Sequence, residues 1–113
     1  MADEGEYPKT DGDVYYGKDA NMSYYQAALA ETMNQASVNI TSADTTILAA
    51  NSSRKGLILY NNGSNTIFIG KTGVTSSTGY PLYADDTLFL FNKEEIHGIT
   101  ASTTEDLRYI EVQ

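Results

Sequence analysis

From Val38 to the C-terminus, the sequence alternates between short β-forming runs and clusters of turn-forming residues. The runs are rich in β-branched and aromatic residues, and the clusters are rich in Asn, Ser, Thr, Gly and Asp. About seven strands spaced roughly 8 to 12 residues apart are typical of an all-β sandwich or barrel. We therefore predict a mainly β domain over residues 37–113, a small sandwich or barrel. Its predicted strands are VNIT, TTILAA, GLILYN, TIFIG, TLFLF, IHGIT and LRYIEV.

Two of these runs, GLILY and TLFLF, are apolar at successive positions. Because neighbouring side chains in a strand point to opposite faces, both faces of these strands are apolar. Another element, such as an N-terminal helix or a second subunit, is expected to cover the outer face. We therefore predict a homo-oligomer and favour a trimer. In the last run, Arg108 and Glu111 are expected to be exposed.

The first 18 residues are predicted to form an extended, acidic, tyrosine-rich arm. Residues 1–35 contain seven acidic residues against two lysines, and five of the nine tyrosines. Pro8, Gly12 and Gly17 interrupt the first half of this region. Tyrosine is enriched in interfaces because it offers a large apolar area with a polar tip. The arm is either a docking segment or a solvated acidic tail.

Residues 19–36 are predicted to form one short amphipathic helix. The apolar residues in this region are spaced 3, 4, 4 and 3 positions apart, as on one face of a helix. A helix of this length is marginal by itself. It must therefore pack on the β domain, on a second copy or on another protein. The apolar stripe is Met22, Tyr25, Leu29, Met33 and Ala36.

Length, charge and cysteine content exclude several classes of protein. The chain has 113 residues, enough for one domain, and a formal net charge of -8. Its seven basic residues form no stripe, so no nucleic-acid partner is expected. The sequence contains no cysteine, no apolar secretory segment and no run of 18 apolar residues. We therefore expect no disulfides, no thiolate metal sites and no membrane partner.

The stretch NNGSNTIFIGKTG, residues 61–73, admits two interpretations. Its Gly70-Lys71-Thr72 ending suggests a phosphate-binding loop, but that motif requires a glycine where Asn65 stands. Strand-forming residues precede Gly70, and the following GVTSSTG is a poor start for a helix. Asn62-Gly63 favours a tight turn instead. We predict a β-hairpin over this stretch.

No other arrangement of residues indicates catalysis or metal binding. His97 is the only histidine, so a structural role is favoured and a His-pair metal site is excluded. Adjacent acidic residues are expected to be solvated in turns rather than to work as acid and base. We therefore predict that the protein is not an enzyme and carries no cofactor or metal. The adjacent pairs are Asp85 and Asp86, and Glu94 and Glu95. Asp11 and Asp13 stand two positions apart, as in some calcium loops, but the following Val14-Tyr15-Tyr16 breaks the calcium-loop pattern.

Two segments resemble virion proteins of tailed bacteriophages. The segment DGDVYYGKDANMSYYQAALAE, residues 11–31, resembles the strand, Asn and short helix found in phage minor structural proteins. Residues 47–70, ILAANSSRKGLILYNNGSNTIFIG, followed by GYPLYADDTLFLF, are similar to head-decoration and head-fibre-like β domains. Ala84-Asp85-Asp86 replaces the usual Pro-Gly turn of those domains. The resemblance covers about 70 residues and consists of turn and strand patterns.

This resemblance implies a non-enzymatic capsid decoration protein that binds the outside of the assembled head and stabilises it. The partner would be the major capsid protein of the virus. The protein would be made in the host cytoplasm and end on the virion surface. The arm and the helix would carry the contact residues: Tyr7, Val14, Tyr15, Tyr16, Met22, Tyr25, Leu29 and Met33.

Two alternatives stay open. The same β domain is compatible with a tail fibre or baseplate component that binds a host-surface glycan. In that case Tyr80 and Tyr83 would stack on a sugar, and Asp85 and Asp86 would accept its hydrogen bonds. The other alternative is an assembly chaperone that is absent from the finished virion.

Overall fold

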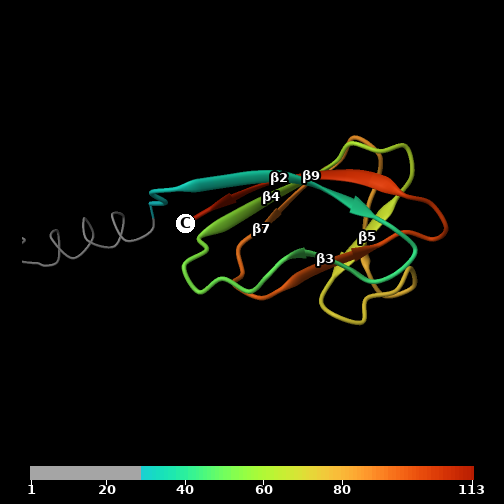
Figure 1. The fold of residues 1–113 in the computed structure, drawn as a ribbon, viewed down its shortest axis with the longest axis horizontal. Coiled ribbons are helices and arrows are strands. Elements are labelled where there is room, and N and C mark those ends of the chain that lie inside the picture. Colours follow the sequence, from blue (N-terminus) through green and yellow to red (C-terminus); the bar gives the residue numbers. More distant parts are fainter. Residues whose placement is uncertain (1–28) are drawn as a thin grey trace, which may run out of the picture. The chain divides into compact units, whose positions relative to one another are not determined.

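The computed structural model describes residues 29–113, drawn in colour in Figure 1. Residues Glu31–Gln113 form one compact unit. The predicted arm over residues 1–18 and the first ten residues of the predicted helix lie outside the described residues. The same is true of six predicted contact residues: Tyr7, Val14, Tyr15, Tyr16, Met22 and Tyr25.

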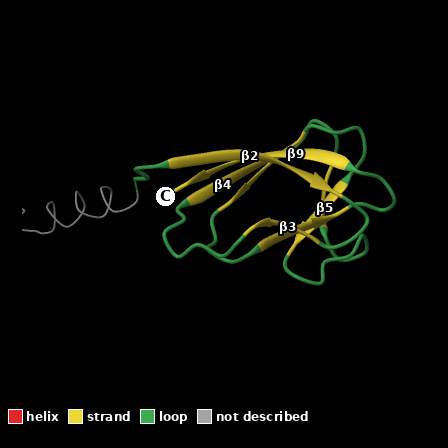
Figure 2. Cartoon of the chain, viewed as in Figure 1, coloured by secondary structure: helices red, strands yellow, loops and turns green. Residues whose placement is uncertain are grey.

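The described residues form eight strands in two antiparallel sheets of four strands each, and no helix (Figure 2). The strands are β2 (Met33–Ile40), β3 (Thr45–Leu48), β4 (Gly56–Asn61), β5 (Ile67–Gly70), β6 (Tyr80–Leu82), β7 (Thr87–Leu90), β8 (Ile96–Ile99) and β9 (Glu105–Val112). The first sheet has the order β2-β9-β4-β7, and the second has the order β3-β8-β5-β6. Figure 1 shows the first sheet above the second.

Both sheets contribute to one hydrophobic core. Leu57 and Leu59 of β4 are buried while Ile58 between them is only partly so, as expected when side chains alternate along a strand. Each fully buried aliphatic side chain stabilises the fold by about 1.5–3 kcal/mol relative to exposure. The burial of this cluster is therefore what holds the two sheets together. Its members are Ile40, Ile47, Leu57, Leu59, Ile67, Ile69, Leu82, Ile96 and Leu107.

The predicted mainly β fold is confirmed in its strands. Every one of the seven predicted runs overlaps a strand of the structure. β6 is not among the predicted strands, because it is only three residues long and contains Pro81. Proline cannot donate a ladder hydrogen bond, but it is tolerated in an edge strand. β6 is such an edge, because it pairs only with β5.

The predicted helix over residues 19–36 is wrong at its C-terminal end. β2 begins at Met33 and pairs with β9 from Met33↔Val112 through Ala36↔Tyr109. Thr32 and Gln113 extend this ladder by exchanging both backbone hydrogen bonds, at 2.7 and 2.9 Å. The long-range pairing with β9 overrides the helical spacing of the apolar residues. The β domain therefore begins near residue 31 rather than at the predicted residue 37.

The predicted hairpin over residues 61–73 is also wrong. The two strands that this stretch joins belong to different sheets: β4 pairs with β9 and β7, and β5 pairs with β8 and β6. The turn is real, but it carries the chain from one sheet to the other. Asn61 supports the crossing, because its side-chain amide donates to the carbonyls of Asn65 and Leu82, at 2.8 and 2.9 Å.

Glu105, at the start of β9, holds this crossing turn in place. Its carboxylate accepts hydrogen bonds from the Ser64 amide at 2.8 Å and from the Asn65 side chain at 2.9 Å. Hydrogen bonds from the Thr103 side chain, the Asn65 side chain and the backbone amides of Ser64 and Asn65 lower the pKa of Glu105 to about 2. A Cβ at position 63 would lie 2.2 Å from Glu105 Oε1 and 2.9 Å from Glu105 Cβ, so a larger residue in place of Gly63 would have to displace this side chain.

Candidate contact surface

The described residues offer no metal centre. Residues 29–113 contain no group of three or more His, Asp or Glu side chains arranged to hold a metal ion. Among the same residues, no helix is long and apolar enough to span a membrane. The features of this region that bear on function are therefore its surfaces and its buried polar groups.

The outward side of the first sheet carries a continuous set of apolar side chains. Ile110 on β9, Ile58 on β4 and Phe89 on β7 are register partners across three adjacent strands. Met33 and Val112 are register partners two residues further along. All of them alternate with core positions and so point away from the core. We call this surface the open face and define it as Met33, Ile58, Phe89, Phe91, Ile110 and Val112.

The largest side chains of the open face are well exposed. Met33 is 62% exposed, Phe89 is 58% exposed and Phe91 is 81% exposed. The Phe91 ring lies above the backbone at Gly56, where an added Cβ would be 3.8 Å from the ring. A contiguous exposed apolar surface of this kind marks an interaction site more often than does an isolated exposed residue. The open face is thus the main candidate contact surface.

Polar residues border the open face at the opposite end of the strands. Arg108 Nη2 lies 2.8 Å from Asp106 Oδ2, and the Asn62 side chain donates to the same carboxylate at 3.0 Å. These two partners lower the pKa of Asp106. The Tyr60 hydroxyl donates to Asp85 Oδ1 at 2.9 Å, and this bond raises the pKa of Tyr60. The border is therefore charged and hydrogen-bonded, whereas the open face is not.

The outward side of the second sheet is covered by the chain itself. Val74, in the loop between β5 and β6, is buried. Its side chain lies against Gly70 and Gly79, where an added Cβ would in each case be 2.8 Å from Val74 Cγ2. A Cβ on Gly79 would also be 2.6 Å from the Cβ of Phe68 on β5. We call this surface the closed face: Phe68, Gly70, Val74, Gly79 and His97.

His97 fastens the closed face from β8. Its Nδ1 lies 2.6 Å from Asp44 Oδ1, and Nε2 lies 3.0 Å from Glu95 Oε1 without hydrogen-bond geometry. The Glu95 carboxylate, followed by Asp44, raises the pKa of His97 against the effect of burial. Asp44 also accepts the Gly73 amide at 2.8 Å. His97 therefore ties two loops to the sheet, and neither contact presents a nucleophile or a metal ligand set.

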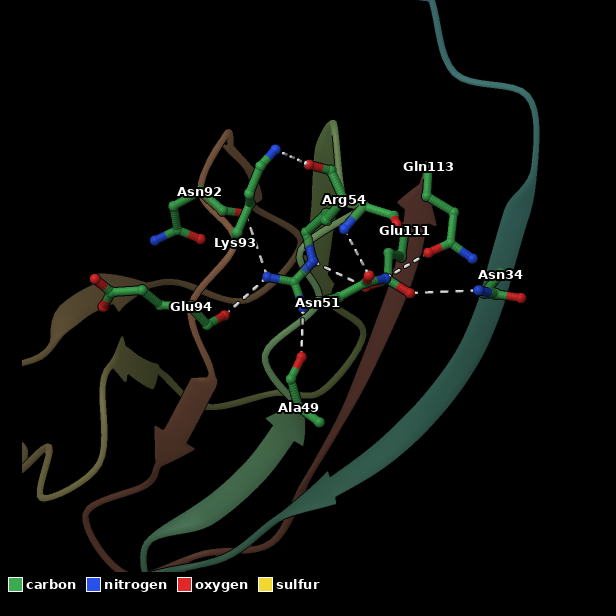
Figure 3. Close-up of polar contacts among 10 residues, drawn as sticks. Asn34, Ala49, Asn51, Arg54, Asn92, Lys93, Glu94, Glu111 and Gln113 are labelled. Carbon is green, nitrogen blue, oxygen red and sulfur yellow. Dashed lines mark hydrogen bonds and ion pairs between the residues drawn. The ribbon is translucent and has the colours of Figure 1, made fainter.

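Arg54 and Glu111 form a buried ion pair at one end of the core (Figure 3). Arg54 Nε lies 2.8 Å from Glu111 Oε2, and the other guanidinium nitrogens donate to backbone carbonyls. Those carbonyls belong to Ala49, Asn92 and Glu94, at 2.6, 3.3 and 2.8 Å. Burial raises the pKa of Glu111, but hydrogen bonds from Arg54, Asn51 and Asn34 lower it overall. This network joins the ends of both sheets and has a structural role.

The expectation that Glu111 is exposed is therefore wrong, whereas Arg108 is exposed as predicted. Strict alternation along β9 puts Glu111 on the same side as Leu107 and Tyr109, which is the core side. That alternation was a usable signal in the sequence. The partner Arg54 gave no comparable signal, because it lies in a turn-forming cluster between β3 and β4.

Of the predicted capsid-contact residues, the structure describes Leu29 and Met33. Both side chains are exposed. Met33 belongs to a strand rather than a helix, and it lies at the corner of the open face beside Val112. The other members of this face are not predicted by the sequence as one surface, although two of its strands, GLILY and TLFLF, are apolar on both sides.

The predicted glycan-contact residues lie around β6 and the turn that follows it. Tyr80 is 61% exposed and Tyr83 is 58% exposed. Asp85 has a positive φ of 64° and is held by the Tyr60 hydroxyl, and the Asp86 amide donates to the Tyr83 carbonyl at 3.0 Å. Within the described residues, no side-chain hydrogen bond joins either tyrosine to either aspartate. The turn thus presents two exposed aromatic rings but no assembled sugar site.

No protein-family model, no curated protein and no solved structure matches this chain.

Proposed function

We propose that this chain is a non-enzymatic virion component of a tailed bacteriophage, a decoration protein that binds the outside of the assembled head. Its body would be a β-sandwich built from the two sheets. Its partner would be the major capsid protein, and the protein would be made in the host cytoplasm and end on the virion surface. The proposal rests on the resemblance of residues 11–31 and 47–91 to phage virion proteins and on one physical observation.

The observation that supports the proposal most directly is the open face. Burying an apolar side chain such as Phe91 on a partner stabilises a complex by about 1.5–3 kcal/mol before the costs of binding. The chain enters this face at Met33, directly after the tyrosine-rich N-terminal region. The proposed contact residues before and at the start of β2 are Tyr7, Val14, Tyr15, Tyr16, Met22, Tyr25, Leu29 and Met33.

Many copies on a capsid lattice would turn weak individual contacts into firm attachment. A protein that binds only the assembled shell stabilises that shell by mass action. Several subunits in one homo-oligomer would strengthen the effect, and the trimer favoured by the sequence stays a prediction.

Binding to purified heads tests the proposal. We expect the full chain to co-sediment with heads and the fragment 31–113 to remain folded but lose at least most of that binding. The fragment begins at residue 31 because β2 and its Thr32–Gln113 extension must be kept intact. Circular dichroism provides the control for folding. Undiminished binding by the folded fragment would contradict an N-terminal anchor.

A glycan-binding tail fibre or baseplate component is the second candidate, and the exposure of Tyr80 and Tyr83 favours it. The copy number in purified particles, measured by quantitative mass spectrometry against the major capsid protein, separates the two. A number comparable with that of the capsid protein supports head decoration. A small number favours the tail, and glycan binding that is lost in Tyr83→Ala would then identify the loop. Absence from the particle would favour an assembly chaperone.

A further inference from the structure

The four edge strands of the two sheets are protected to very different degrees. An exposed edge presents unpaired backbone N–H and C=O groups that can pair with another chain. β3 has only four residues and an irregular register between Thr46 and Leu48. β6 has three residues, one of them Pro81, and β7 has four. Short strands, bulges and proline are the devices that block pairing at an edge.

β2, the fourth edge strand, has none of these devices. It is eight residues long and keeps an unbroken register with β9 from Met33↔Val112 to Ile40↔Glu105. Its sequence, MNQASVNI, contains no proline, glycine or charged residue. Within residues 29–113, no strand pairs with its other edge. β2 is therefore the one edge in this region suited to accept a further strand.

The backbone groups on this edge can be identified from the ladder. Thr32 and Gln113 exchange both hydrogen bonds, which makes them a hydrogen-bonded pair. Such pairs alternate along an antiparallel ladder, so even-numbered residues of β2 bond to β9. The N–H and C=O groups of the odd-numbered residues point toward the free edge. These residues are Met33, Gln35, Ser37 and Asn39.

We infer that β2 pairs with β2 of a second copy of this chain, antiparallel, about a two-fold axis perpendicular to the first sheet. An uncharged strand can lie against its own copy without like-charge repulsion. Antiparallel pairing also places the two Met33 residues, where β2 begins, at opposite ends of the interface.

One register uses all four outward residues and places the two Ala36 residues opposite each other on the axis. Ala36 is an even-numbered residue, so this position is a non-hydrogen-bonded pair, where side chains approach most closely. A small side chain suits that spacing. In the same register Gln35 of each copy lies opposite Ser37 of the other.

The two-fold axis keeps the open faces of both copies on the same side of a continuous eight-stranded sheet. The pairing doubles that apolar surface without covering it. It requires an even number of copies, either as a dimer or as a larger assembly built from dimers, and it therefore competes with the trimer that the sequence favours. This inference is independent of the proposed virion role, since it rests on the edge of the sheet alone.

The native mass of the full chain tests the inference, by light scattering coupled to size exclusion. We expect an even-numbered assembly whose mass is halved by Ser37→Pro and unchanged by the matched control Ser37→Ala. Proline removes an N–H that points to the free edge and leaves the bonds to β9 in place. Circular dichroism checks that the variant keeps its β structure.

A second variant protects the test against misfolding of Ser37→Pro. The double substitution Gln35→Glu with Ser37→Glu places like charges opposite each other across the proposed interface, whereas within one chain residue 37 lies opposite Arg108 and residue 35 opposite Ile110. It should also halve the mass. A monomeric or trimeric wild-type chain would overturn the inference, and so would an even-numbered assembly that the glutamate variant leaves intact.

Discussion

The outward sides of the two sheets differ, although both belong to strands of similar composition. On the second sheet, Val74 lies against Gly70 and Gly79, and His97 holds two loops through Asp44 and Glu95. On the first sheet, Met33, Phe89 and Phe91 are each more than half exposed. One face is completed by the chain's own loop, and the other is left apolar at its surface.

Because of this difference, the closed face should contribute to the stability of the fold, and the open face should contribute to contact with a partner. Side chains of the closed face contribute to folding because their apolar area is removed from water within the same unit. The exposed side chains of the open face, Met33, Phe89 and Phe91, contribute less to the folding of that unit, since most of their area stays in water until something covers it. Substitutions on the two faces should therefore be measurable in different experiments.

Replacement of Arg54 should have the largest effect on the free energy of unfolding, because Arg54 bonds to residues at the ends of both sheets. Arg54→Ala leaves the buried Glu111 carboxylate without its cation, which typically costs about 3–5 kcal/mol. We expect that loss in the free energy of unfolding measured with urea. The double variant Arg54→Met with Glu111→Leu removes both charges and should lose much less. Equal losses in the single and double variants would contradict the role assigned to the ion pair.

Matched phenylalanine substitutions should show the difference between the faces directly. Phe68→Ser on the closed face is expected to lower the free energy of unfolding by about 1–3 kcal/mol, because part of that side chain is buried. Phe89→Ser on the open face should change it by no more than about 0.5 kcal/mol. Thermal and urea unfolding of the two variants, at a concentration low enough to separate subunits, provide the measurement. A comparable loss of unfolding free energy in both variants would contradict the distinction between the closed face and the open face.

The pH dependence of His97 should show the smallest effect. Glu95 and Asp44 raise the pKa of His97 in the folded chain above the unfolded value of about 6.5. A raised folded pKa stabilises fully below the unfolded pKa, and the stabilisation is lost as pH rises through the folded pKa. The advantage of the wild-type chain over His97→Gln should therefore be larger at about pH 5.5 than at about pH 8.5. An advantage that does not change across this range would exclude a charged His97 as the fastening group.

Strand positions followed from the sequence because each run carries its own local evidence. The predicted runs GLILYN and LRYIEV are rich in β-branched, aliphatic and aromatic residues between turn-forming clusters, and β4 and β9 lie where these runs predict them. β6 could not be predicted this way, since three residues that include Pro81 carry too little pattern.

Strand pairing did not follow from the sequence, because distant residues decide it. The turn at Asn62-Gly63 has the local chemistry of a hairpin, yet Glu105, some forty residues later, holds it as a crossing between sheets. Met33–Ala36 is a strand because it pairs with Tyr109–Val112. Neither partner is visible in a local window of sequence.

The candidate contact surface was predictable in part. Two-faced apolar strands indicated an outer surface that needs a cover, and the open face is that surface. Phe89 and Phe91 can be assigned to the same surface as Met33 and Ile110 only when the order of the strands in the sheet is known. The sequence does not give that order. The covered state of the second sheet depended on Val74, a single valine in a loop of small polar residues.

The most direct measurement of the central claim is oxidative footprinting of the free chain and of the chain in purified particles. We expect Met33, Phe89 and Phe91 to react readily with hydroxyl radicals in the free chain and to be protected in the particle. Tyr80 and Tyr83, on the second sheet's edge, should remain reactive in both and serve as internal controls. Unchanged reactivity of the open face, with protection of Tyr80 and Tyr83 instead, would contradict the account and point to the β6 turn as the contact.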